Sequence, residues 1–162
     1  MRLMKGVIRW VSPVLLAGSF LLSTNAALAA NSQTRDVAQE ESNRTLVVNF
    51  YDRFFNKHQV QEAATVVAED YIQHNPEVPD GKASFVGYFD GYFKENPQSR
   101  ARIVRSAADG DLVYLHVHST NGKADRGQAV IDIFRVKDGK IVEHWDVIQA
   151  VPEQAANSNT MF

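Results

Sequence analysis

The chain has 162 residues, no cysteine and a formal net charge of −2 at neutral pH. This length suits a single domain, and the lack of cysteine excludes disulfides and cysteine-linked lipids. The mildly acidic balance, with no basic stripe interleaved with aromatic residues, disfavours nucleic acid as a partner.

The first 29 residues have the order of a Sec signal peptide. Three basic residues stand within the first nine, an apolar run covers 11–22, and the small-x-small triplet Ala27-Leu28-Ala29 follows. This order predicts cleavage near Ala29 and a mature protein that is periplasmic or secreted, with no stable membrane insertion after cleavage. An uncleaved anchor is the alternative, although the apolar run is shorter than the roughly 20 residues that a span needs.

Composition divides the rest of the chain into three parts. Residues 30–41 are polar, lack apolar periodicity, and are predicted to form a flexible lead. Residues 42–152 form the predicted folded domain. Residues 153–162 are again mostly polar and small, which predicts a loose C-terminal tail.

Apolar residues at helical spacing predict three helices in the first half of the domain. The first helix is capped by Ser42 or Asn43, the second covers about 60–67, and the third ends at Asn96-Pro97. The apolar residues that define them are Val47, Phe50, Tyr51, Phe54 and Phe55 in the first, Ala63, Val66 and Val67 in the second, and Phe85, Tyr88, Phe89, Tyr92 and Phe93 in the third.

Four strands are predicted in the second half, over residues 101–107, 112–119, 128–136 and about 140–150. Asp-Gly pairs mark the turn after the first of these strands and the hairpin turn after the third. Helices followed by an antiparallel meander predict the α+β class, with the helices covering one face of the sheet.

The Asp138-Gly139 turn also predicts which side chains share a face of the sheet. A two-residue hairpin would pair Phe134 with Glu143 and Asp132 with Trp145, and would place all four on one face. A slip of one residue would exchange the faces. Carboxyl groups among apolar side chains suit general acid–base catalysis, which makes Asp132, and then Glu143, candidates. A solvent-facing, salt-bridged strand pair is the alternative.

Three histidines could take part in a site. His74 precedes Pro76 near the expected mouth between helices and sheet, where it could donate to a substrate oxygen or only cap a turn. His116 and His118 share one face of their strand, which is either inward or outward. A His-x-His pair with a third histidine could also bind a metal, but no acidic residue follows soon after on that strand, and we therefore predict no metal.

The stretches YIQHNP at 71–76 and DIFRVKDGKIVEHWD at 132–146 resemble those of SnoaL-like domain proteins, within the superfamily of nuclear transport factor 2 and ketosteroid isomerase. The resemblance spans about 43–152. It implies a cone-shaped, curved antiparallel sheet of about four to six strands wrapped around three N-terminal helices, enclosing an apolar pocket. It also implies chemistry of the SnoaL-like polyketide cyclase or aldol-condensation type, and a homodimer.

Together these observations predict a cofactor-free acid–base enzyme (an isomerase, cyclase or aldol-type lyase) acting on a small apolar carbonyl compound. Asp132 would carry the proton, and His74 and His118 would stabilise the enolate oxygen. The predicted substrate-binding residues are His116, Glu143, Trp145, Tyr88, Phe85, Phe89 and Phe134. Two alternatives stay open: a non-catalytic periplasmic binding module, and a metal-dependent enzyme that uses His74, His116 and His118.

Overall fold

The computed structural model describes residues 34–162, and the predicted signal peptide lies outside this part of the chain. Within residues 34–162, no helix has both the length and the apolar character to cross a membrane. The description below concerns the unit Arg35–Phe162 by itself.

The first described helix, α2, covers Val37–Tyr51 and begins several residues before the expected start. Asp36 caps it by accepting a hydrogen bond from the backbone N–H of Gln39. Glu40 is buried, pairs with Arg35 and accepts from the backbone N–H of Gly110. The Arg35 guanidinium, helped by that N–H, lowers the pKa of Glu40. The flexible lead expected over 30–41 is therefore wrong from Val37 onward, because polar contacts hold this turn of the helix to the sheet.

The helical half continues with short and long elements. A π-helix, Asp52–Asn56, extends α2. A single turn, α3, covers Val60–Ala63 and passes through a 3-10 turn at Ala64–Val66. The last helix, α4, covers Lys82–Glu95 and ends at Asn96, whose N–H donates to the carbonyl of Tyr92. The three predicted helices are confirmed, with the second shorter than expected.

The sheet has five strands in the order β1-β5-β4-β3-β2. Their bounds are Val67–Gln73 for β1, Ser99–Asp109 for β2, Leu112–Asn121 for β3, Gln128–Lys137 for β4 and Lys140–Ala150 for β5. β2 to β5 form the expected antiparallel meander, and β1 adds a parallel pair with β5. The predicted α+β fold is confirmed, but the sheet is mixed rather than purely antiparallel.

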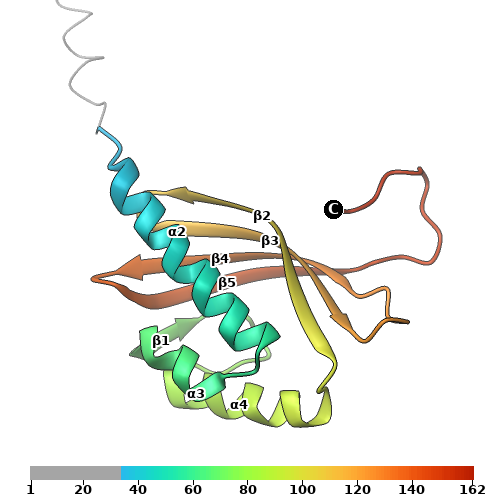
Figure 1. The fold of residues 1–162 in the computed structure, drawn as a ribbon, viewed down its shortest axis with the longest axis horizontal. Helices are drawn as coiled ribbons and strands as arrows, with labels where there is room; N and C mark the ends of the chain where they lie inside the picture. The colour runs from blue at the N-terminus through green and yellow to red at the C-terminus, as the bar shows by residue number, and fades with distance from the viewer. Residues whose placement is uncertain (1–33) are drawn as a thin grey trace, which may run out of the picture. The chain divides into compact units, whose positions relative to one another are not determined.

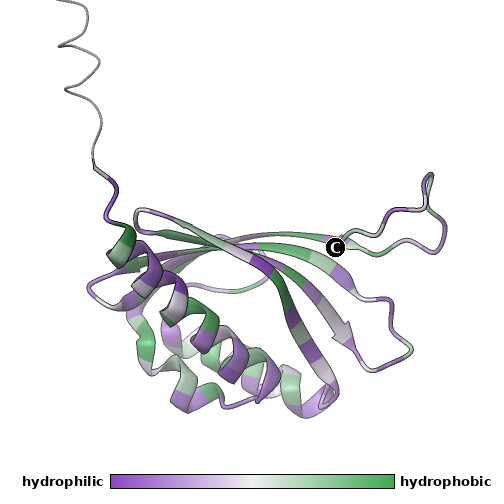
Figure 2. Cartoon of the chain, turned by 45° about the horizontal axis from the view of Figure 1, so that its top comes forward, coloured by the Kyte–Doolittle hydropathy of each residue, from purple (hydrophilic) through white to green (hydrophobic). Residues whose placement is uncertain are grey.

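The helices lie on one side of the curved sheet (Figure 1), with α2 against β2 and β3 and α4 against β1. Hydrophobic and hydrophilic residues alternate along the strands (Figure 2), as expected for a sheet with one covered face. Aromatic side chains from the helices meet apolar side chains of β3 and β4 in the core. The largest fully buried side chains of the core include Phe54, Tyr71, Leu115, Phe134 and Ile141.

The β4–β5 hairpin decides which side chains reach the covered face. Its turn is the expected two-residue one, because Lys137 pairs with Lys140 and both Asp138 and Gly139 have positive φ. The register then shifts by one residue between the Val136–Ile141 pair and the Arg135–Glu143 pair, with Val142 as the extra residue. Beyond this bulge every β5 side chain lies on the face opposite to the predicted one.

The face away from the helices, here called the outer face, carries Ile131, Ile133, Trp145 and Val147, of which Ile131 is 42% and Val147 72% exposed. Exposed apolar groups of this kind mark association surfaces. We expect the mature protein to form a homodimer through this face, and Val147→Asp to weaken the dimer. Light scattering of both proteins at micromolar concentration checks this. A monomeric wild-type protein would contradict it.

Candidate functional site

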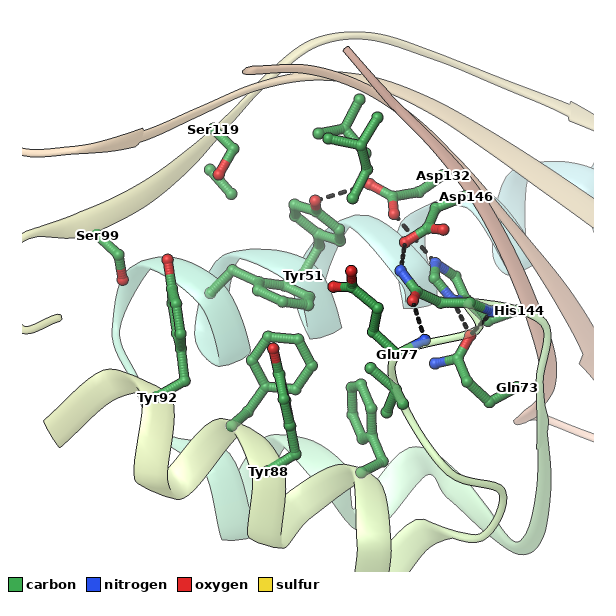
Figure 3. A pocket seen from close by; sticks show the side chains of 18 of the residues that line it. Tyr51, Gln73, Glu77, Tyr88, Tyr92, Ser99, Ser119, Asp132, His144 and Asp146 are labelled. Atoms are coloured by element: carbon green, nitrogen blue, oxygen red, sulfur yellow. Dashed lines mark hydrogen bonds and ion pairs between the residues drawn. The ribbon is translucent and has the colours of Figure 1, made fainter. Parts of the chain in front are cut away.

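A cavity of about 250 Å³ lies between the helices and the covered face of the sheet. Aromatic side chains of α2, its π-helical extension and α4 form one wall, and β4 and β5 supply a polar end (Figure 3). Its aromatic lining consists of Tyr51, Phe55, Tyr71, Phe85, Tyr88, Phe89, Tyr92, Phe93 and Phe134. A cavity that combines an aromatic wall with a group of polar side chains at one end is typical of a small-molecule site.

A chain of hydrogen bonds crosses the polar end of the cavity. The Tyr51 hydroxyl donates to Oδ2 of Asp132 at 2.7 Å, and Nε2 of His144 lies 3.0 Å from Oδ1 of the same carboxylate. When Asp132 is ionised, His144 donates through Nε2, because a carboxylate only accepts. Its Nδ1 lies 2.8 Å from Oε1 of Gln73. Asp132 and His144 are 5% and 7% exposed, so this network is screened from water.

Asp146 lies beside this chain, directly opposite Asp132 on the neighbouring strand. Its Oδ2 accepts a hydrogen bond from the Asn75 side chain at 2.8 Å. One ligand atom each from Asp132, His144 and Asp146 lie within 4.8 Å of one another. Two carboxylates and one imidazole thus converge at the end of the cavity, where they can hold a proton or a cation.

Two tyrosine hydroxyls complete this end of the cavity. Burial raises the pKa of Tyr51 well above its ordinary value, and the charge of Asp132 adds to the effect. Burial raises the pKa of Tyr71 in the same way, followed by the charges of Asp132 and Asp146. Both hydroxyls therefore stay protonated and act as donors. The Tyr71 hydroxyl is buried and, among the described residues, has no hydrogen-bond partner of ordinary geometry, although Gln73 lies close enough to influence its pKa.

Five of the predicted site residues line the cavity: Asp132, Phe134, Phe85, Phe89 and Tyr88. Asp132 and Phe134 are buried, and Tyr88 is 43% exposed at the edge of the cavity. The structure therefore brings the predicted proton carrier together with the predicted aromatic wall.

Glu143, Trp145 and His74 do not line the cavity, contrary to the predicted faces. The bulge at Val142 turns Glu143 and Trp145 to the outer face, and His74 joins them there: its ring stacks on Trp145 at 4.6 Å and its Nε2 contacts Glu143 at 2.9 Å. His74 and Arg135 lower the pKa of Glu143. This carboxylate is ion-paired and partly exposed, so it is not placed for acid–base work inside the cavity.

His116 and His118 also face away from the cavity. His116 pairs across the strands with Ile131, which belongs to the outer face. The ring of Phe162, at the end of the tail, stacks on His118 at 4.1 Å and on His116 at 5.7 Å. His74, His116 and His118 therefore form no shared metal site among the described residues. His74 and His118 do not line the cavity, so the structure does not bring them to Asp132 as the predicted enolate-stabilising groups.

Sequence reasoning missed His144, Asp146, Gln73 and Asn75 as site residues. One signal was present: with the shifted register, Arg135 pairs with Glu143 and forms an ion pair at 2.8 Å. The unshifted register would have placed Arg135 opposite Val142. Opposite charges on facing residues stabilise a strand pair, so charge pairing favours the register that brings His144 and Asp146 inward.

We expect protein purified without chelator to carry well under one equivalent of zinc, iron or copper. Both oxygens of Asp132 already accept hydrogen bonds, and Nε2 of His144 carries the proton that one of them uses. A metal that used Nε2 of His144 would have to displace that proton and its hydrogen bond to Asp132. Elemental analysis checks this, and a full equivalent of metal that is lost in His144→Gln would contradict it.

The profile of the SnoaL-like domain family matches residues 47–144, well over half of the chain, and the chain therefore belongs to this family. Solved structures share the fold. A candidate ketosteroid isomerase from Kribbella flavida DSM 17836 is 22% identical, with a TM-score of 0.57 over 74% of this chain and 86% of its own. A candidate polyketide cyclase from Bacillus cereus ATCC 10987 is 24% identical, with a TM-score of 0.56 over 66% and 74%.

A SnoaL-like protein of unknown function from Burkholderia thailandensis E264 has a TM-score of 0.59 at 13% identity, over 67% of this chain and 97% of its own. Among curated proteins, none matches this chain significantly. At these identities the structural likeness establishes the fold, and the chemistry has to be argued from the cavity itself.

Proposed function

We propose that this protein is an acid–base enzyme that moves a proton on a small, largely apolar carbonyl compound, with Asp132 as the proton carrier. The observation that supports this most is the placement of Asp132. It is a buried carboxylate at the polar end of a cavity with an aromatic wall, held in place by the Tyr51 hydroxyl and the His144 imidazole. A carboxylate oriented in this way suits general base catalysis.

In the proposed step, Asp132 takes a proton from the carbon next to the carbonyl. The electron pair of the C–H bond moves to form the carbon–carbon double bond of an enolate, and the carbonyl oxygen gains the charge. The Tyr71 hydroxyl, a buried group with no hydrogen-bond partner among the described residues, would donate to that oxygen. In a β,γ-unsaturated ketone, return of the proton from Asp132 to the γ-carbon gives an isomerase. Attack of the enolate on a second carbonyl, whose oxygen then takes the proton from Asp132, gives an aldol-type cyclase.

Exchange of the substrate's α-hydrogen tests the proposal without requiring the full reaction. A panel of small ketones with apolar substituents is incubated with the protein in D₂O, and deuterium incorporation is followed by NMR. We expect accelerated incorporation for compounds that fit the cavity, and its loss in Asp132→Asn. Compounds that bind in the cavity but exchange at the uncatalysed rate would contradict the enzyme.

A non-catalytic binding module is the second candidate, and one observation favours it. Both oxygens of Asp132 already accept a hydrogen bond, from Tyr51 and from His144. These two contacts use lone pairs that a base would direct at its substrate, which favours a binding module. Catalysis would have to use the second lone pair of one of the oxygens. The exchange experiment separates the two candidates, because a binding module leaves the α-hydrogen in place.

We also propose that the protein acts outside the cytoplasm. The basic, apolar and Ala-Leu-Ala order of the first 29 residues supports export. We expect the mature chain to begin near Ala30, and N-terminal sequencing of the exported protein measures this. A chain that starts at Met1 in a membrane fraction would identify an anchor instead.

A further inference from the structure

Acidic side chains outnumber basic ones in the lining of the cavity. Three carboxylates line it, those of Asp132, Asp146 and Glu77, and we call them the acid end. Figure 3 shows Asp132 and Asp146 together at one end, with Glu77 reaching toward the middle from the loop after β1. The one lysine or arginine in the lining is Arg100, an exposed residue whose guanidinium donates to the carbonyls of Pro97 and Ser99.

Nothing in the described part of the chain neutralises the acid end. His144 is the one side chain there that can carry a positive charge, and it faces Asp132. Asp146 accepts from the neutral amide of Asn75, and Glu77 forms no ion pair with any residue from 34 to 162. Carboxyl groups therefore outnumber the groups that can carry a positive charge at the acid end. Asp132 is buried, where charge interactions are stronger than in water, whereas Asp146 is half-buried and Glu77 is exposed.

A second, independent feature points to an occupant. The Tyr71 hydroxyl is almost fully buried, lines the same cavity and lacks a hydrogen-bond partner among the described residues. Burial raises the pKa of Tyr71, and the charges of Asp132 and Asp146 add to this effect. A buried hydroxyl without a partner costs free energy, so a group that meets it inside the cavity is favoured.

The aromatic wall also suits a positive charge. The rings of Tyr51 and Phe55 lie 4.4 Å apart, and those of Tyr88 and Phe89 lie 5.0 Å apart, all lining the cavity. The faces of such rings attract cations and accept apolar groups equally well. An anion would meet the carboxylates, whereas an ammonium group supplies three hydrogen-bond donors for them.

We propose that the cavity takes a small organic cation: a protonated amine whose ammonium group lies at the acid end, while its apolar body lies along the aromatic wall. This names the substrate class of the proposed enzyme as amino carbonyl compounds, and in that respect it rests on the proposed function. A volume of about 250 Å³ limits the ligand to a compound smaller than most drugs. Alkylamines are protonated at neutral pH, as lysine is.

Three probes with the same phenyl body test the charge preference: 2-phenylethylammonium, 2-phenylethanol and 3-phenylpropanoate. Calorimetric titrations use phosphate buffer, because Tris is itself an amine. We expect the ammonium probe to bind at least about tenfold more tightly than the alcohol, and the carboxylate probe to bind most weakly. Equal affinities, a preference for the carboxylate, or no saturable binding of the ammonium probe at millimolar concentration would overturn the proposal.

Asp146→Asn and Glu77→Gln each remove one negative charge from the acid end while keeping the side-chain shape. We expect each variant to lower the affinity for the ammonium probe by about tenfold and to leave the affinity for the alcohol unchanged. Asp90→Asn, on α4 and outside the cavity lining, is the matched control and should change neither. Unchanged ammonium affinity in both cavity variants would overturn the proposal, and the second variant serves if the first does not fold.

These measurements need no turnover, so the two proposals can fail separately. Selective ammonium binding without α-hydrogen exchange in any amino ketone would leave the cation site standing and remove the enzyme. Exchange in neutral ketones, together with equal affinity for the three probes, would support the enzyme and remove the cation site.

Discussion

Asp132→Asn is expected to lower the rate of α-hydrogen exchange, and of any turnover, by about 10²- to 10⁴-fold. The amide keeps the size of the carboxyl group but cannot take up a proton from carbon at neutral pH. The Tyr51 hydroxyl can still donate to the remaining oxygen, so the fold should be retained. Exchange measured by NMR on a compound shown to bind gives the rate, and circular dichroism with urea unfolding verifies the fold.

Asp90→Asn controls for the loss of one negative charge, because the Asp90 side chain is 47% exposed on α4 and pairs with Lys94. Near-normal exchange in Asp132→Asn would contradict the assigned base. The base would then be sought at Asp146, which lies opposite Asp132 in the same cavity. Glu143 and His74 are not alternatives, because both lie on the outer face.

The fold could be predicted from the sequence because its signals are local. Apolar residues at helical spacing placed α2 and α4, and the two Asp-Gly turns placed β2 to β5. β1 was missed as a strand, because its partner β5 lies about 70 residues later in the chain. Parallel strands are not joined by a tight turn, so no turn sequence marks the pair. The early start of α2 was missed because Glu40 is held by Gly110, a contact between distant parts of the chain.

The site was predicted only in part, because the β4–β5 hairpin contains a one-residue shift in register that the sequence analysis did not include. β4 was placed correctly, so Asp132 and Phe134 were assigned to the same face and both line the cavity. On β5, a single extra residue at Val142 exchanged inner and outer side chains. Trp145, chosen as a pocket residue for its aromatic ring, instead stacks on His74 outside. His144 and Asp146, one position along from Glu143 and Trp145, lie inside.

Phe54 packs against the aromatic side chains that line the cavity. Phe54 is fully buried, and its ring stacks on Phe85 at 4.7 Å and meets Phe89 at 5.4 Å and Phe93 at 5.9 Å. It therefore joins the π-helical end of the first helix to α4, and Phe85 and Phe89 in turn line the cavity.

Phe54→Ala is expected to lower the free energy of unfolding by about 3–5 kcal/mol, because the change removes buried aromatic surface and leaves a hole that rigid neighbours fill only partly. Urea unfolding followed by fluorescence measures it. Tyr88→Ala is the matched control: it also truncates an aromatic residue, but Tyr88 is 43% exposed, so the loss should be much smaller. Because Phe54 supports Phe85 and Phe89, its truncation should also weaken the binding of any ligand in the cavity. A loss below about 1 kcal/mol would mean that α4 is held mainly by its contacts with β1, and that the aromatic wall does not need Phe54.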